Sequence, residues 1–442
     1  MRAPGPPASR PSPFDTIACA ATAPSGFPTG RISTDSLDPA LSPLLLSHFT
    51  ATTCLGHGLA DHANALREQR GGLAPCRFEG VRLQTHVGEV PDVDAQRVPE
   101  QLAAFDCRNN RLAWLALQQD GFAGHVVAAR ERYGPRRIGV FLGTSTGGIL
   151  ETERAYRRRD ATGALPADFD YARQHSPFAL PAFVRACFGL TGPAAVSSAC
   201  SSGAKVFASA RRMIEAGWID AAVVGGVDTL CLTTLYGFDS LELVSAQPCR
   251  PYDVARNGIS IGEGAGFALL ERAPTRPGPD AILLSGIGES SDAHHMSSPH
   301  PEGLGARMAM AQALSDAGLS PADIDYINLH GTATRANDAA EGRAVLDLFG
   351  ATPCSSTKGA TGHTLGAAGA VEAVIAALAL REGFMPAGIH TATVDPALPV
   401  QYLLQTRRQP MRHVMSNAFG FGGSNCSLLF SRADAACAGA DA

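Results

Sequence analysis

The stretch that decides the fold is AAVSSACSSGAKVFASARRMIEA, residues 194–216. An apolar strand pattern at 194–198 is followed by a turn of small residues and by a helical pattern from about 201 to 216. Small side chains permit a sharp strand-to-helix turn, which would lift the thiol of Cys200 into a cavity. The free N–H groups at the helix N-terminus would favour its thiolate. Cys200 is therefore the candidate nucleophile, although a cysteine taken alone is more often an inert core residue.

Apolar strand patterns and helical patterns alternate along the rest of the chain. Further strands are predicted at 137–143, 221–227, 281–286 and 324–329. Further helices are predicted at 305–317, 338–348 and 367–381. This alternation predicts an α/β protein whose parallel or mixed sheets are covered by helices on both faces.

The order of predicted elements is similar in two parts of the chain, which are connected by PTRPGPD at 274–280. We therefore predict an N-terminal half at 41–280, which contains the nucleophile, and a C-terminal half at 281–432. The Pro-rich residues 1–40 are predicted to be a disordered tail on composition alone, and residues 433–442 a flexible C-terminal tail.

The bulk composition argues against several classes of protein. The formal net charge is −5 and no long Lys/Arg run is present, so nucleic-acid binding is not indicated. The eleven cysteines include no C-x-x-C pair, which indicates neither a zinc site nor a disulfide framework and favours a reducing, cytoplasmic setting. The longest nearly apolar stretch, residues 360–380, contains His363 and Glu372. It therefore predicts a buried loop and helix rather than a membrane span.

Two histidines follow predicted strands or precede predicted helices. HGTAT, residues 330–334, comes directly after an apolar strand, and KGATGH, residues 358–363, leads into a helix. Near that helix N-terminus, neutral imidazole is favoured for His363, and two neutral imidazoles aimed at one point would stabilise a forming enolate. The alternative is that His330 and His363 each cap a strand or helix through a hydrogen bond.

Three further features carry weaker signals. Lys358 could be a solvated surface charge, and Glu341, eleven residues after His330, an exposed helix residue. NAFGFGGSN, residues 417–425, could turn a backbone N–H into a cavity, because glycine permits unusual backbone angles and close approach. It could equally be a tight turn packed by two aromatic side chains, whereas no phosphate-loop motif accompanies it.

Together these motifs resemble the elongating β-ketoacyl-[acyl carrier protein] synthases of the thiolase-like superfamily. The resemblance extends from about residue 44 to 430. Its pieces are SSACSSG around Cys200, HGTAT at 330–334, KGATGHTLGAAG from 358, NAFGFGGSN at 417–425, PCRPYD at 248–253 and GISIGEGAG at 258–266. Such a protein has a five-layered αβαβα fold of two similar halves and is usually a dimer.

The resemblance also implies an activity, namely decarboxylating Claisen condensation of an acyl-enzyme thioester with malonyl-acyl carrier protein to give 3-oxoacyl-acyl carrier protein. Cys200 would accept the acyl group, and His330 and His363 would assist decarboxylation and stabilise the enolate. Lys358 and Glu341 would hold the histidine loops.

The same resemblance assigns the residues around the acyl group. The backbone N–H groups of Cys200 and Phe421 would form the oxyanion hole, and Phe419 and Phe421 would line or gate the acyl pocket. Thr146, in the GTSTGG loop, would tune acyl-chain length. No metal and no cofactor of its own is implied, because the phosphopantetheine arm belongs to the partner acyl carrier protein.

Some positions depart from the family pattern. Arg335 and Ala339 replace prolines that the family often has, which predicts an altered loop shape. HFTATTCLG at 48–56 and CLTTLYGF at 231–238 resemble the branch found in aryl polyene and related pigment or polyketide pathways.

Three relatives of the fold are alternatives. A chain-length factor typically lacks the active cysteine, a synthase that primes from coenzyme A has asparagine where His363 stands, and a degradative thiolase uses a second cysteine near its C-terminal glycine motif. Here Cys426 follows that motif and is predicted to be a strand residue. A binding-module interpretation remains only if the motif loops fail to converge.

The predicted partners are an acyl carrier protein and a second synthase chain, in a homodimer or in a heterodimer with a chain-length-factor-like homologue. Because carrier proteins are acidic, Arg67, Arg70 and residues 157–159 are candidate contacts, with a solvated charged face as the alternative.

Overall fold

The structure is a computed structural model that describes residues 43–197 and 199–436. By its internal contacts the chain divides into residues 1–39 and 40–442, and every described residue belongs to the second unit. The tail predicted at 1–40 lies outside the described residues, as does Ser198. Of the C-terminal tail predicted at 433–442, the first part forms a short helix, α12 (Ala433–Ala436), and the rest is outside the described residues.

Ten strands form the body of the main sheet, five from each half of the chain. The first half contributes β1 (Leu44–Thr53), β5 (Ile138–Gly143), β6 (Ala194–Ser197), β7 (Ala221–Asp228) and β8 (Gly264–Arg272). The second half contributes β9 (Ile282–Ser291), β10 (Tyr326–Asn328), β11 (Cys354–Ser355), β14 (His413–Gly420) and β15 (Ser424–Arg432). The strand β2 (Gly56–His57) pairs with β1 beside this path.

The two halves have the same topology. The strand order is β6-β5-β7-β8-β1 in the first half and β11-β10-β14-β15-β9 in the second. In each half the first three strands of this order are parallel and the last two pairings are antiparallel. Pairing of β1 with β9, at Leu44 with Leu284 and Leu45 with Leu283, joins the halves edge to edge.

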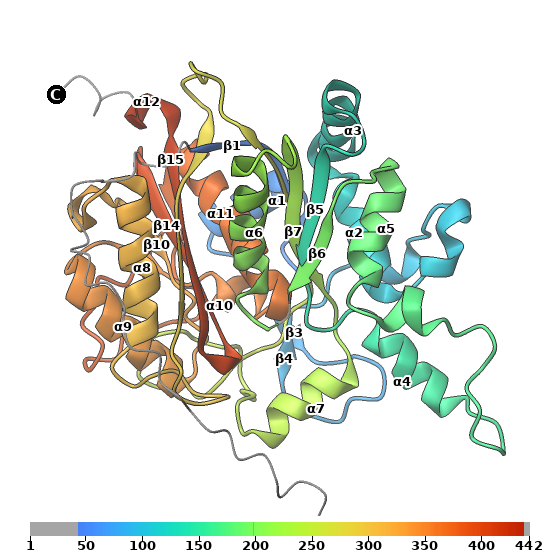
Figure 1. Ribbon diagram of the computed structural model, residues 1–442. Coiled ribbons are helices and arrows are strands. Elements are labelled where there is room, and N and C mark those ends of the chain that lie inside the picture. Colours follow the sequence, from blue (N-terminus) through green and yellow to red (C-terminus); the bar gives the residue numbers. More distant parts are fainter. Residues whose placement is uncertain (1–42, 198, 437–442) are drawn as a thin grey trace, which may run out of the picture. The chain divides into compact units, whose positions relative to one another are not determined.

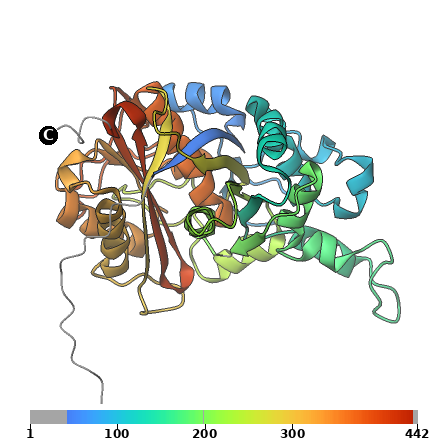
Figure 2. The ribbon, with the colours of Figure 1, turned by 45° about the horizontal axis from the view of Figure 1, so that its top comes forward.

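Two helices lie between the strands of the two halves. α6 (Ser202–Glu215) and α11 (Ala368–Glu382) contact each other, and both contact β7 of the first half and β14 of the second. Figure 1 shows this central pair, and Figure 2 shows α6 nearly end-on between the two groups of strands. Sequence explains the burial of α11, since AGAVEAVIAALAL is apolar apart from Glu372 and all thirteen of these residues are buried.

Other helices cover the outer faces. In the first half these are α2 (Arg108–Leu117), α3 (Phe122–Tyr133) and α5 (Ala179–Phe188), and in the second half α8 (Leu304–Ala317) with α9 (Arg335–Phe349) packed on it. The layers therefore follow the order αβαβα, which confirms the predicted fold class.

The remaining helices are α1 (Leu59–Arg67), α4 (Ile149–Arg157), α7 (Leu232–Ser240) and α10 (Lys358–Thr361). The predicted helix at 338–348 begins earlier than expected, at Arg335, because the hydroxyl of Thr334 caps it by accepting the backbone N–H of Asn337. No helix among the described residues is both long and apolar enough to cross a membrane.

Candidate active site

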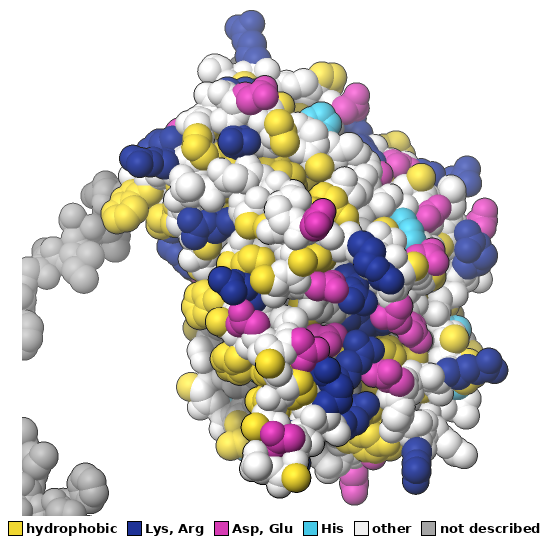
Figure 3. Space-filling view, turned by 90° about the vertical axis from the view of Figure 1, so that its right-hand side faces the viewer, with side chains coloured by type: hydrophobic (Ala, Val, Ile, Leu, Met, Phe, Trp, Pro, Cys, Tyr) yellow, Lys and Arg dark blue, Asp and Glu magenta, His cyan; other side chains and the backbone are white. Residues whose placement is uncertain are grey.

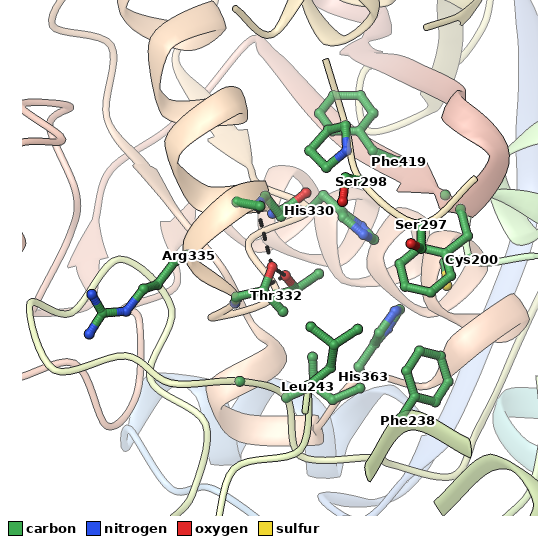
Figure 4. A pocket seen from close by; sticks show the side chains of 18 of the residues that line it. Cys200, Phe238, Leu243, Ser297, Ser298, His330, Thr332, Arg335, His363 and Phe419 are labelled. Atoms are coloured by element: carbon green, nitrogen blue, oxygen red, sulfur yellow. Dashed lines mark hydrogen bonds between the residues drawn. The ribbon is translucent and has the colours of Figure 1, made fainter. Parts of the chain in front are cut away.

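Four motifs that are far apart in the sequence line one cavity of about 440 Å³. Its wall includes Cys200, His330, His363, Phe419 and Phe421. Figure 4 shows the thiol and the two imidazole rings facing a common space. Cys200 lies between β6 and α6, and His363 lies between β11 and α11. Because β6 and β11 occupy the same place in the two halves, the repeated topology explains why both residues reach this cavity.

Cys200 lies in the strand-to-helix turn that the sequence predicts. Ala199 takes a left-handed φ of 79°, and α6 begins two residues after the cysteine, at Ser202. The turn at Gly420 packs against it, since a Cβ added at Gly420 would lie 3.3 Å from the backbone nitrogen of Cys200. The glycine thus permits the close approach of the two loops from different halves.

The thiol of Cys200 is 7% exposed, and burial raises its pKa to about 11. The charge of Lys358 and a hydrogen bond from the backbone of Phe421 lower this pKa but do not offset the burial. The resting group is therefore a thiol, which differs from the thiolate expected from the helix N-terminus alone. The backbone of Phe421 nevertheless lies at the sulfur, where an oxyanion-hole donor is needed.

His330 and His363 form a close pair. Their ring centroids are 5.4 Å apart with an interplanar angle of 85°, and each side chain is 3% exposed. Burial, followed by the charge of Lys358, holds the pKa of both imidazoles well below the ordinary value. Both rings are therefore neutral near pH 7, each with one N–H donor and one acceptor nitrogen.

Lys358 is buried behind this pair, so it is not a solvated surface charge. Its Nζ donates to the backbone oxygen of His330 at 2.6 Å, lies 3.3 Å from the Nδ1 of the same residue and is paired with Glu372. When the ammonium donates to Nδ1, the imidazole proton must be on Nε2. Lys358 thereby selects the His330 tautomer that can donate away from the lysine.

Glu341 is also buried, so the exposed alternative is wrong. Its carboxylate accepts the backbone N–H groups of His330 at 2.8 Å and Gly331 at 2.7 Å, and the side-chain amide of Asn417 at 3.2 Å. Burial raises its pKa to about 7, while these three donors lower it. Glu341 thus holds the turn that carries His330 and connects it to β14.

Of the three side chains predicted around the acyl group, Phe419 and Phe421 line the cavity and Thr146 does not. The Phe419 ring is 5.9 Å from the His330 ring inside the cavity. Phe421 is 37% exposed and packs against Phe238 of α7 with ring centroids 5.8 Å apart. Thr146 does not line this cavity: its hydroxyl and its backbone N–H both donate to Asp228, at 2.6 and 2.7 Å, and its role in acyl-chain length stays a prediction.

Sequence reasoning missed two buried carboxylates. Glu372 pairs with Lys358, and Asp228 ends the buried strand β7. The available signal in each case was an isolated acid within or directly after an apolar run, which requires local donors when it is buried. No group of three or more potential metal ligands occurs among residues 43–197 and 199–436.

Comparison with known proteins identifies the family of the chain. The family models "Beta-ketoacyl synthase, N-terminal domain" and "Beta-ketoacyl synthase, C-terminal domain" match residues 64–276 and 282–392. A mitochondrial 3-oxoacyl-[acyl-carrier-protein] synthase of Arabidopsis thaliana is 39% identical over 90% of this chain and 95% of its own length. The 3-oxoacyl-[acyl-carrier-protein] synthase 2 of Coxiella burnetii is 33% identical over 86% and 95%.

Solved structures show the same relationship. The ketosynthase ApeO of Xenorhabdus doucetiae, in complex with its chain length factor ApeC, matches with a TM-score of 0.79 and 39% identity over 89% of this chain and 99% of that chain. A β-ketoacyl synthase from Burkholderia phymatum matches with a TM-score of 0.79 and 30% identity over 89% and 100%. The chain therefore belongs to the β-ketoacyl synthase family, and it is a condensing acyltransferase of fatty acid or polyketide synthesis.

Proposed function

We propose that Cys200 accepts an acyl group from an acyl carrier protein and that His330 and His363 then drive decarboxylating condensation with malonyl carrier protein. The observation that carries this proposal is the shared cavity, which brings one thiol, two neutral imidazoles and the Phe421 turn together. The phosphopantetheine arm enters as part of the substrate, so the chain requires no cofactor of its own.

The first step transfers the acyl group. The sulfur of Cys200 forms a bond to the carbonyl carbon of the incoming thioester, and the bond from that carbon to the carrier sulfur breaks. The thiol proton passes to the departing thiolate, so one thiol and one thioester are present on both sides of the step. The backbone N–H groups of Cys200 and Phe421 stabilise the oxyanion, each contributing about 3–4 kcal/mol by comparison with other enzymes.

The second step removes carbon dioxide from malonyl carrier protein. The bond between the methylene carbon and the carboxylate breaks, and its electron pair delocalises onto the thioester oxygen as an enolate. His330 and His363 are neutral, and each can donate its single N–H to that oxygen. Lys358, behind His330, holds the proton on the nitrogen that faces away from the lysine.

The third step forms the carbon–carbon bond. The enolate carbon attacks the acyl carbon on Cys200, the carbon–sulfur bond breaks, and the thiolate takes up one proton from solvent. The products are 3-oxoacyl carrier protein, carbon dioxide and the free thiol. The high pKa of Cys200 favours uptake of that proton and returns the enzyme to its resting state.

The pathway we propose is the aryl polyene or a related pigment or polyketide branch, in a heterodimer with a chain-length-factor-like homologue. Support comes from the 39% identity to ApeO, which was solved with its chain length factor, and from the HFTATTCLG and CLTTLYGF segments. A homodimer is the alternative. We place the reaction in the cytoplasm, a proposal supported by the free thiols of the nine described cysteines.

The carrier protein remains the proposed partner, but three of the five predicted basic contacts are already paired within the chain. Arg67 pairs with Glu382, Arg70 with Glu68, and Arg158 with Asp168. Figure 3, which faces the side of α4 and α5, shows Lys and Arg side chains mixed with Asp and Glu rather than gathered in one basic patch. Docking through Arg67, Arg70 or Arg158 would therefore require exchange of surface ion pairs, which costs little.

Intact mass spectrometry tests the proposed function. We expect wild-type protein and Cys107→Ala, which removes another buried thiol, to gain one acyl group from an acyl carrier protein, while Cys200→Ala gains none. Octanoyl, long saturated and aryl-primed carriers, each with and without the co-expressed partner chain, distinguish the pathways. Acylation of Cys200→Ala, or no acylation of wild type by any of these carriers, would refute the proposal.

A further inference from the structure

Asp228 is a fully buried carboxylate that the mechanism above does not use. It ends β7 and does not line the cavity. Its two oxygens accept hydrogen bonds from five donors, which are the hydroxyls of Thr144 and Thr146 and the backbone N–H groups of Ser145, Thr146 and Ala367. Their distances are 2.6–3.0 Å, so every donor is within ordinary hydrogen-bond range.

These donors come from both halves of the protein. Four of them belong to the loop that follows β5, in the first half. The fifth, the N–H of Ala367, belongs to the short 3₁₀ turn at Leu365–Ala367 in the second half. That turn lies between His363 and the start of α11. The carboxylate therefore connects the His363 loop to β7 and to the loop after β5, both in the first half.

Packing at the turn leaves no room for adjustment. A Cβ added at Gly366 would lie 2.7 Å from the backbone nitrogen of Ser145 and 2.8 Å from Oδ2 of Asp228. Leu365, the residue before it, has a left-handed φ of 51°. On the other side, the His363 backbone is bridged to the 260–262 segment, with N–H to the Ser260 oxygen at 2.7 Å. His363 is thus held from two sides, and Asp228 provides one of them.

We propose that Asp228 is a positioning residue that fixes the His363 imidazole for decarboxylation. The inference rests on the proposed function, because it assigns His363 a role in that step. Burial raises the pKa of Asp228, and the hydrogen bonds from Thr144, Ser145 and Thr146 lower it and thereby favour the ionised carboxylate. Asparagine would turn an N–H₂ group toward some of those donors, and the turn would have to shift.

The test measures the two half-reactions separately in Asp228→Asn. Acylation of Cys200 is followed by intact mass, and decarboxylation by conversion of malonyl carrier protein to acetyl carrier protein. We expect kcat for decarboxylation to fall by about 10- to 100-fold, because misplacement of a reacting group by about 1 Å has that effect. The KM for malonyl carrier protein and the acylation rate should stay within about threefold, since no hydrogen bond among the described residues joins Asp228 or the 3₁₀ turn to Cys200 or Phe421.

Glu271→Gln is the matched control. Glu271 is a buried carboxylate on β8, the strand that pairs with β7. It pairs with Ala221 at the start of β7, whereas Asp228 pairs with Gly264 at the other end. It accepts hydrogen bonds from Tyr133 and Arg132, far from the cavity. This variant should leave both half-reactions unchanged.

Two outcomes would overturn the inference: equal losses in acylation and decarboxylation, or no loss in either. If Asp228→Asn does not fold, Gly366→Ala places a methyl group against Oδ2 of Asp228 and should produce the same split. Failure of the wild type to acylate Cys200 would instead count against the proposed function, so the two failures are distinguishable.

Discussion

Burial, more than the helix termini, determines the protonation of the three reacting side chains. It raises the pKa of Cys200 to about 11 and holds the pKa of His330 and His363 well below the ordinary range. The cavity therefore presents a neutral thiol and two neutral imidazoles to the substrate, while the Lys358–Glu372 pair lies behind them.

The first prediction concerns the reactivity of Cys200. Because only the thiolate is alkylated and burial raises its pKa to about 11, the iodoacetamide rate should rise about tenfold for each pH unit across the accessible alkaline range. Intact mass after timed quenching measures the rate, with Cys200→Ala as the background. A plateau near pH 8 would show that the thiol is not held in its neutral form.

The second prediction concerns the imidazoles. An ordinary histidine titrates near pH 6.5, whereas burial holds the pKa of His330 and His363 well below that value, so both should still be neutral at pH 6.5. Nuclear magnetic resonance of protein carrying 13C-labelled histidine would test this, with His330→Asn and His363→Asn for assignment. Chemical shifts that titrate with a midpoint near pH 6.5 would contradict it.

At this scale the sequence indicated the residue types but not their surroundings. Cys200, His330 and His363 stand out because each follows or precedes a regular element within a run of small residues. The predicted thiolate state of Cys200 was wrong, because the sequence indicates the helix N-terminus but not the burial of the sulfur. The supporting acid Asp228 was missed because its donors come from residues 80 or more positions away.

The central helices approach each other through glycine. A Cβ added at Gly203 of α6 would lie 2.5 Å from the backbone nitrogen of Ala370 in α11, whereas one added at Gly237 of α7 would meet nothing within 4 Å. Gly203 and Gly237 are both in helices, so they differ mainly in the space available to an added methyl group.

The third prediction uses this pair. Gly203→Ala should lower the free energy of unfolding by about 1–3 kcal/mol, since the backbones of α6 and α11 must separate. Gly237→Ala should raise it by about 0.5–1 kcal/mol, because alanine is the better helix former. Midpoints of thermal unfolding give the signs. A Gly203→Ala midpoint at or above that of wild type would contradict the packing argument.

Helices were predictable as elements, and strand pairing was not. The 3.6-residue patterns located α6, α8, α9 and α11 to within about three residues. By contrast, the apolar run at 324–329 yields only the three-residue strand β10, because strand length depends on the partners β11 and β14. Such partners are distant in the sequence and leave no local signal.

The two halves share one central layer, in addition to the outer apolar cluster that each half packs under its own helices. The largest buried cluster includes residues of α6 and α11 together with strand residues of both halves, among them Val224 and Val414. The sequence showed a similar order of elements in each half, but it did not show that the helices between the sheets are held in common.

The fourth prediction follows from this shared core. The halves should unfold in one transition, because loss of the strands of either half exposes α11, whose thirteen buried residues are apolar apart from Glu372. Hydrogen exchange with mass spectrometry, read across a denaturant series, should show β7 and β14 losing protection at the same concentration. Two separate midpoints would mean that the halves are independent domains.

Cys200 and His363 hold equivalent places in the two halves, and this equivalence has a consequence for redesign of the substrate range. The sulfur rests on the start of α6 and the imidazole on the approach to α11, and these helices touch through alanine and glycine. The distance between the sulfur and the imidazole therefore depends on how closely α6 and α11 pack. Exchanges among small apolar residues in the middle layer would alter catalysis while every polar side chain stays as it is.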